Sequence, residues 1–235
     1  MTHEELVEKG IVWLIDKPFE WTSFDAVNKL KGCLKHVFPK SKIKIGHAGT
    51  LDPLATGLLV ICAGKATKKI AQIQDAEKEY TGTFYLGATT PSYDRETGVD
   101  NTFDISAITL EMIKEAASSF LGEHIQTAPA FSARKVDGKR AYEMARKGVD
   151  PGLKPHQVFI REFEIMRFEG NEIDFRVSCS KGTYIRTMAN DLGKKLNNGA
   201  YLIKLVRTRI GEHELKNAVS PEEMVARIKS GAAFI

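Results

Sequence analysis

The sequence has few features of extracellular, membrane or metal-binding proteins. Only three cysteines occur among its 235 residues, and none forms a C-x-x-C pair, so neither a disulfide framework nor a zinc site is expected. The longest apolar run, LLVICA at 58–63, is too short to cross a bilayer. The acidic start, MTHEELVEKG, lacks the basic and apolar regions of a signal peptide. We therefore expect a cytoplasmic protein with no membrane association.

Motifs for common cofactors are also missing. The six histidines show no H-x-H or H-x-x-x-H spacing, and no metal is implied. GKAT at 64–67 resembles the end of a Walker loop, but Gly57 lies too far before it and alanine follows the lysine. No G-x-G-x-x-G opens a helix, and no G-x-S-x-G elbow occurs. The sequence thus gives no support for nucleotide cofactors or serine hydrolysis.

The balance of charge is mildly basic and unevenly distributed. The formal net charge is +4, which permits a polyanionic partner without requiring one. In KSKIKIGH, alternate residues Lys40, Lys42 and Lys44 would share one face of an extended segment. Further basic clusters occur at 132–148 and 202–211. Each cluster alone is typical of a solvated surface.

Hydrophobic periodicity predicts an α+β domain with a mixed sheet. Strands are expected at 10–18, 56–64, 79–87 and 201–211, with a hairpin over 162–180, and helices at 21–38, 65–75, 109–121, 183–196 and 220–228. The helix at 109–121 should have Leu110, Ile113, Ala117 and Leu121 on one side. No linker divides the chain, so we expect a single domain over 1–235, with a basic insertion at about 127–155.

The stretch GHAGTLDPLATG at 46–57 places one carboxylate, Asp52, among glycines and threonines. Asp followed by Pro is typical of a helix N-cap and first helical residue. The alternative is functional, because glycines allow close approach of a ligand and Pro53 restricts Asp52 to extended backbone. A rigid loop of this kind is suited to presenting a nucleophile, and the local pattern leaves both interpretations open.

Several motifs together resemble the TruB family of pseudouridine synthases. They are GHAGTLDPLATGLLVICAGKATK, LIDKPFEWTSFDAV, KEY, FSARKVDGKRAYEMARKG, CSKGTYIRTMANDLG and GAYLIKLVRTRIG, and they run in order from about residue 11 to 211. The resemblance implies the pseudouridine synthase fold, with a largely antiparallel central sheet flanked by helices. It also implies isomerisation of the T-loop uridine of tRNA, pseudouridine-55 synthesis, by the stand-alone bacterial type of enzyme.

The family's chemistry would explain the lone carboxylate. The bond between the ribose and N1 of uracil is cut, the base rotates, and C5 joins the ribose, so no water, cofactor or metal is needed. A hydrolytic glycosidase needs two carboxylates, whereas here the leaving base becomes the next nucleophile. The resemblance assigns this role to Asp52. Whether Asp52 attacks the ribose carbon or removes a ribose proton stays open.

Other site residues are carried over by motif. Arg186 would keep the carboxylate ionised and oriented, although a solvent-facing helix arginine fits its pattern equally. Tyr80 would stack on the flipped base, although a core aromatic is the simpler interpretation. The resemblance gives substrate-binding roles to His47, Tyr184 and Leu205. The basic insertion would clamp the T-arm.

Partners and alternatives follow from the same comparison of motifs. The expected partner is tRNA, with no obligate protein partner, and the chain is expected to be a monomer. Because it ends soon after the last motif, we expect no separate C-terminal RNA-binding domain and adequate recognition of an isolated T-arm. Pro91, Ala130 and Val206 differ from the residues that are common in the family at these positions. These differences affect the expected RNA contacts and not the catalytic residues. A non-catalytic RNA-binding or tRNA-folding protein and a carbohydrate-active enzyme are the alternatives.

Overall fold

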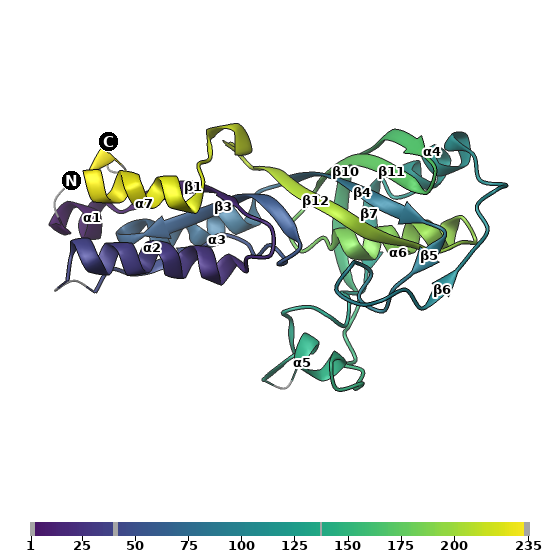
Figure 1. Cartoon of the computed structure of the whole chain (residues 1–235), viewed down its shortest axis with the longest axis horizontal. Helices are drawn as coiled ribbons and strands as arrows, with labels where there is room; N and C mark the ends of the chain where they lie inside the picture. The colour runs from purple at the N-terminus through teal and green to yellow at the C-terminus, as the bar shows by residue number, and fades with distance from the viewer. Residues whose placement is uncertain (1–2, 40–41, 137, 233–235) are drawn as a thin grey trace. The chain divides into compact units, whose positions relative to one another are not determined.

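The computed structural model describes residues 3–39, 42–136 and 138–232 (Figure 1). It forms two compact units: unit 1 comprises Met1–Tyr80 with Val206–Ile235, and unit 2 comprises Thr81–Leu205. Lys40 lies outside the described residues. Within the described ranges, no helix is long and apolar enough to cross a membrane.

The strands of unit 1 follow the order β1-β3-β12-β4. Strands β1 (Ile11–Lys17) and β3 (Ala55–Ala63) are antiparallel, with Ile11 opposite Ala63 and Lys17 opposite Gly57. The short strand β2 (Ile45–His47) also pairs with β3, and β13 (His213–Glu214) pairs with β12. Strands β4 (Lys78–Leu86) and β12 (Ala200–Ile210) have residues in both units. The strands expected here are confirmed.

Unit 1 also contains its own helices. They are α1 (His3–Lys9), α2 (Ser23–Val37), η1 (Gly64–Lys69), α3 (Ile70–Asp75), η2 (Leu215–Asn217) and α7 (Pro221–Ser230). Thr22 and Asp25 form the capping box that starts α2. The buried face of α2 packs with Trp13 and Ile15 of β1 and with Met224 of α7 in one hydrophobic core. The helix expected at 65–75 begins instead as the 3-10 turn η1.

Unit 2 follows the strand order β12-β4-β11-β10-β7. Strands β10 (His156–Glu169) and β11 (Glu172–Cys179) form the expected hairpin, and β7 (Gly122–Gln126) pairs with β10. Phe84 stacks on Phe175 with ring centroids 4.0 Å apart. The sheet therefore has a packed aromatic core on one face. Two small ladders, β5 (Ala88–Thr89) with β6 (Asn101–Thr102) and β8 (Lys135–Val136) with β9 (Lys139–Arg140), complete the strands.

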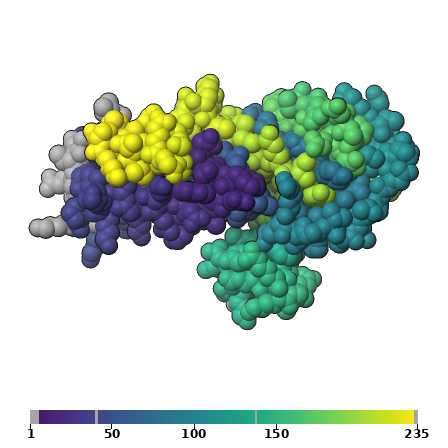
Figure 2. Space-filling model, in the orientation of Figure 1, coloured from purple at the N-terminus to yellow at the C-terminus, as the bar shows by residue number. Residues whose placement is uncertain are grey.

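The described residues of unit 2 also form the helices α4 (Leu110–Ser118), α5 (Ala141–Ala145) and α6 (Ile185–Lys195). The prediction that the helix reaches residue 121 with Leu121 on its apolar side is wrong, because α4 ends at Ser118. Leu121 is exposed, and Phe120 is buried in its place, edge-on to Phe163. The basic insertion, with α5 at its centre, stands out from the rest of unit 2 (Figure 2). Strands and helices in both units confirm the α+β fold class.

Candidate active site

Asp52 lies in the loop that joins β2 to β3, where no helix follows it. The backbone N–H of Ala55 donates to the carbonyl of Asp52 at 3.1 Å, and Pro53 occupies the second position of this turn, where proline is favoured. The helix N-cap interpretation of the Asp-Pro pair is therefore wrong. The half-buried Asp52 is presented from a tight turn immediately before a buried strand.

A buried arginine holds the first half of this loop. Arg207 of β12 is 1% exposed. Its guanidinium donates to the carbonyl oxygens of Gly49 (3.0 Å), Thr50 (3.3 Å) and Leu58 (2.8 Å). One planar group with several fixed donors thus ties the loop to β3, the strand that follows it.

A buried lysine holds the second half. The Lys17 side chain, at the end of β1, is fully buried, and its ammonium donates to the carbonyls of Pro18 (2.9 Å), Trp21 (2.5 Å) and Pro53 (3.3 Å). Burial lowers the pKa of Lys17 to about 8, while the charge of Asp52 opposes this shift. Lys17 and Arg207 therefore place two cations around the loop that carries Asp52.

The segment after β1 adds direct backbone links. Leu51 exchanges two hydrogen bonds with Ser23, its N–H donating to Oγ (2.8 Å) and its carbonyl accepting from Oγ (3.1 Å). The N–H of Glu20, a residue in left-handed backbone with φ of 67°, donates to Pro53 (2.9 Å). The motif LIDKPFEWTSFDAV therefore braces the residues on both sides of Asp52.

His47 and Tyr80 belong to the same unit. His47 ends β2 opposite Ile61 of β3. Its pKa is lowered, chiefly by burial and also by the positive charge of Arg207, which favours the neutral ring. Tyr80 lies in β4 and is buried, at 8% exposure, so burial alone agrees with both interpretations of this tyrosine.

Arg186 lies in the first turn of α6 in unit 2. It is 3% exposed, so the solvent-facing interpretation is wrong. The guanidinium donates to the carbonyl of Phe131 through two nitrogens (3.1 Å each) and to that of Ser92 (3.3 Å), and its Nε lies 3.5 Å from a carboxylate oxygen of Asp94. Asp94 was not selected from the sequence. It lies in the segment TTPSYD at 89–94, whose local pattern does not show that its carboxylate meets Arg186.

Tyr184 and Leu205 are also in unit 2. The backbone N–H of Tyr184 donates to the Gln126 side chain (2.9 Å), whose amide donates back to the Tyr184 carbonyl (3.2 Å). The Tyr184 ring meets His156 edge-on, with centroids 6.0 Å apart. Leu205, in β12, is 9% exposed. The start of α6 is therefore fixed by its neighbours in the same unit.

The six predicted residues thus divide between the units. Unit 1 holds His47, Asp52 and Tyr80, and unit 2 holds Tyr184, Arg186 and Leu205. Within the described part of the chain, no group of three or more His, Cys, Asp or Glu side chains could hold a metal ion. Unit 1 holds one carboxylate on a braced loop, and unit 2, described by itself, holds a buried guanidinium and an ordered aromatic ring.

Comparison with known proteins relates these features to a family. Residues 35–185 match the TruB family pseudouridylate synthase (N terminal domain). The tRNA pseudouridine synthase B of Flavobacterium johnsoniae is 58% identical over 93% of this chain and 96% of its own length. That of Phocaeicola vulgatus is 51% identical over 92% of each chain. One chain of a crystal structure of a Cbf5-Nop10-Gar1 complex has a TM-score of 0.70 and 26% identity over 96% of this chain. The present chain spans 56% of that longer one.

The fold and the site define the class of protein, which is an α+β enzyme that presents one carboxylate from a braced loop. The chain belongs to the TruB family of pseudouridine synthases. Membership confirms the resemblance found in the sequence, the fold class, and the expected isomerase activity.

Proposed function

We propose that the protein isomerises the T-loop uridine of tRNA, at position 55, to pseudouridine. The observation that carries the proposal is the braced loop, in which Lys17, Ser23 and Arg207 fix the backbone on both sides of Asp52. Relatives at 58% and 51% identity are tRNA pseudouridine synthases B, which supports tRNA as the substrate. These relatives are bacterial enzymes, which supports a cytoplasmic location.

The reaction balances without a co-reactant. The bond from the ribose carbon to N1 of uracil breaks, and a bond from the same carbon to C5 forms. C5 loses its hydrogen as a proton and N1 gains one, so the composition of the nucleotide is unchanged. Asp52 acts on the ribose while the detached base stays bound, and no second carboxylate is required because no water attacks.

The remaining site residues bind and orient the substrate. Arg186, rigidly held by Phe131 and Asp94, is assigned to the carboxylate of Asp52 by its motif. Tyr80 is assigned to the flipped base, and His47, Tyr184 and Leu205 to the loop and base pocket. Flipping a base costs a few kcal/mol, and stacking on an aromatic ring returns about 1–3 kcal/mol.

The basic insertion supplies RNA contacts outside the base pocket. Its hairpin β8–β9 carries the exposed Lys135, Lys139 and Arg140, and phosphate contacts of this kind depend strongly on salt. Arg146 of the insertion pairs with Glu96 at 2.6 Å, which anchors the insertion to the loop after Asp94. No obligate protein partner is proposed, and the working unit is the monomer.

Tritium release tests the proposal directly. Purified protein, with a chelator and no cofactor, is mixed with a tRNA transcript tritiated at C5 of its uridines. We expect the wild type to release about one equivalent, mapped to the T-loop, and Asp52→Asn to release none while still binding tRNA. Asp104→Asn, at an exposed aspartate of unit 2, is the matched control and should react like the wild type. Equal release from Asp52→Asn would contradict the assignment, and tRNA binding without any wild-type release would favour a tRNA-folding protein.

A further inference from the structure

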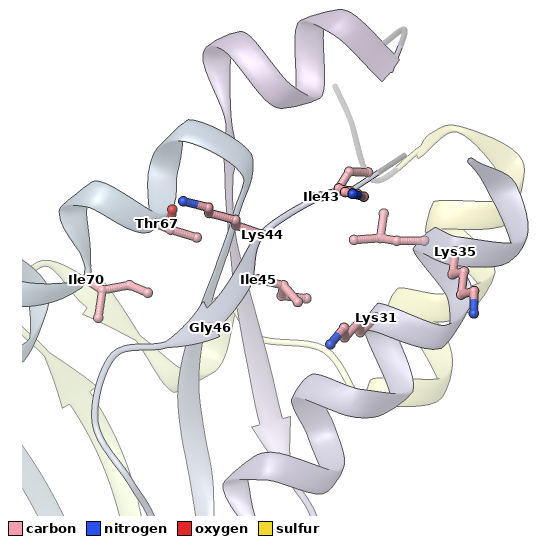
Figure 3. Close-up of a pocket in the computed structure, with 10 residues that line it drawn as sticks. Lys31, Lys35, Ile43, Lys44, Ile45, Gly46, Thr67 and Ile70 are labelled. Atoms are coloured by element: carbon pink, nitrogen blue, oxygen red, sulfur yellow. The ribbon is translucent and has the colours of Figure 1, made fainter. Parts of the chain in front are cut away.

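Unit 1 contains a cleft of about 650 Å³ that the proposed reaction does not use (Figure 3). Its walls are the second half of α2, the segment leading into β2, and η1 with the start of α3. Aliphatic side chains, among them Leu34, Ile45 and Ile70, form its apolar part. The volume is in the range of ligand-binding clefts, so the question is which ligand the lining fits.

The charged groups that the structure describes in the cleft are all positive. Lys31 and Lys35 come from α2, while Lys42 and Lys44 come from the segment before β2, and none of the described residues that line the cleft is acidic. In Figure 3, Lys44 projects near Thr67, on the wall opposite α2. Lys31 and Lys35 are four residues apart on one helix, a spacing at which like charges repel. The cleft therefore favours an anion.

The ion pairs that the structure describes in unit 1 already use several cations, but not the lysines of the cleft. Lys29, on another part of α2, forms an ion pair with Glu222 of α7 at 2.9 Å. Among the described residues, none of the ion pairs includes Lys31, Lys35, Lys42 or Lys44. Their charges are therefore available to a ligand without the loss of an existing salt bridge.

The lining fits a sugar–phosphate backbone better than a base. Among the described lining residues, no aromatic ring is present to stack on a base. The hydroxyl group of Thr67, which lines the cleft, already donates to the carbonyl of Gly64 at 2.7 Å. Lysines act as point charges on flexible stems, which suits phosphates spaced along a strand. The expected contact is therefore electrostatic and independent of sequence.

The cleft lies within reach of an RNA bound at Asp52. Gly46 lines the cleft, and Asp52 follows it by six residues, a distance of at most about 20 Å even for a fully extended chain. We propose that this lysine cleft binds the sugar–phosphate backbone of the substrate tRNA, outside the nucleotide that enters the active site. The identity of the RNA rests on the proposed function.

Matched charge removal tests the cleft. Lys31→Gln/Lys35→Gln removes two cleft charges, and Lys29→Gln/Lys229→Gln removes two charges of the same unit from α2 and α7 outside the cleft. Binding of the tRNA transcript is measured over a range of salt concentrations. We expect the cleft variant to bind about 5–10-fold more weakly at low salt and to lose about 1–2 from the magnitude of its log–log salt slope. The control should match the wild type. Lys42→Gln/Lys44→Gln repeats the test if the first cleft variant does not fold.

Three results would overturn the cleft proposal. The first is an unchanged tRNA affinity and salt slope in a folded cleft variant. The second is an equal loss of tRNA affinity in the control variant. The third is that adenosine monophosphate binding requires Lys31 and Lys35 while tRNA binding does not. Tritium release by the wild type, measured in parallel, tests the proposed function separately. A slope change in the cleft variant with no wild-type release would support the cleft and contradict the enzyme.

Discussion

At the scale of single residues, the site depends on buried cations that bind backbone carbonyls. Arg207 and Lys17 together donate to six carbonyls, three each, and both side chains are almost completely buried. Burying a charge is costly unless hydrogen bonds and opposite charge compensate. Asp52 contributes part of that opposite charge for Lys17. The loop and its cations therefore stabilise each other.

Replacing Arg207 should destabilise the fold. Arg207→Met leaves the carbonyls of Gly49, Thr50 and Leu58 without these donors, and each unsatisfied buried group costs about 1–3 kcal/mol. We expect the free energy of unfolding in urea to fall by about 3 kcal/mol. Arg207→Lys keeps the charge but loses the fork of donors, so its loss should be intermediate. A methionine variant as stable as the wild type would show that these hydrogen bonds contribute little.

Lys17 should make stability depend on alkaline pH. The ordinary pKa of a lysine, which applies to the unfolded chain, is 10.5, and the pKa of Lys17 in the folded protein is about 8. Between these two pH values the unfolded chain therefore binds the proton and the folded chain does not. Stability from this group therefore rises with pH across that window. The difference in unfolding free energy between wild type and Lys17→Met should grow in favour of the wild type from pH about 8 to about 10.5. Lys216→Met, at an exposed lysine, should show no such growth.

These residues also mark the limit of sequence reasoning. The motif around Asp52 was evident, but patterns place charged side chains in solvent, so neither Lys17 nor Arg207 was expected inside the protein. For the same reason, the sequence pattern does not decide between the two interpretations of Arg186. Burial of a charge depends on carbonyls supplied by distant segments, such as Gly49 for Arg207, and local periodicity contains no information about them.

At the scale of elements, the start of α2 has two functions. Thr22 caps the helix through the N–H of Asp25, while the next residue, Ser23, turns inward to hold Leu51. The capping box was predictable because its signature is local. The contact across 28 residues was not. The end of α4 was not predictable in the same way. Because the helix ends at Ser118, Phe120 is buried and Leu121 is exposed.

Substitutions at these two neighbours should separate helix stability from catalysis. Thr22→Ala removes a cap and should cost about 1 kcal/mol of stability, with little change in the rate of tritium release. Ser23→Ala leaves the buried N–H and carbonyl of Leu51 unpaired, which costs about 1–3 kcal/mol, and should also slow release because the loop of Asp52 loosens. The checks are urea unfolding and single-turnover release with saturating protein. Equal rates of tritium release for both variants would show that the Ser23 contact does not contribute to catalysis.

At the scale of the whole molecule, the distribution of charge matters more than its total. A net charge of +4 is small, and many exposed cations are already paired, as Arg167 is with Glu169, Glu172 and Asp174. Exposed ion pairs of this kind contribute little to stability, but they neutralise a cation that RNA could otherwise use. The lysine cleft and the β8–β9 hairpin of the insertion carry exposed basic side chains that remain available to RNA.

RNA binding should therefore respond to these two clusters independently. Lys135→Gln/Lys139→Gln in the insertion, and Lys31→Gln/Lys35→Gln in the cleft, should each lower the salt slope of tRNA binding by about 1–2. If each cluster contacts its own phosphates, the combined variant should lose the sum of the two changes, because independent sites add. Arg167→Gln/Arg176→Gln removes as many charges, but from cations held by carboxylates, and should leave the slope near the wild-type value. A combined variant no weaker than either pair alone would mean that the clusters share one set of phosphates, and an equal effect of the arginine control would mean that net charge governs binding.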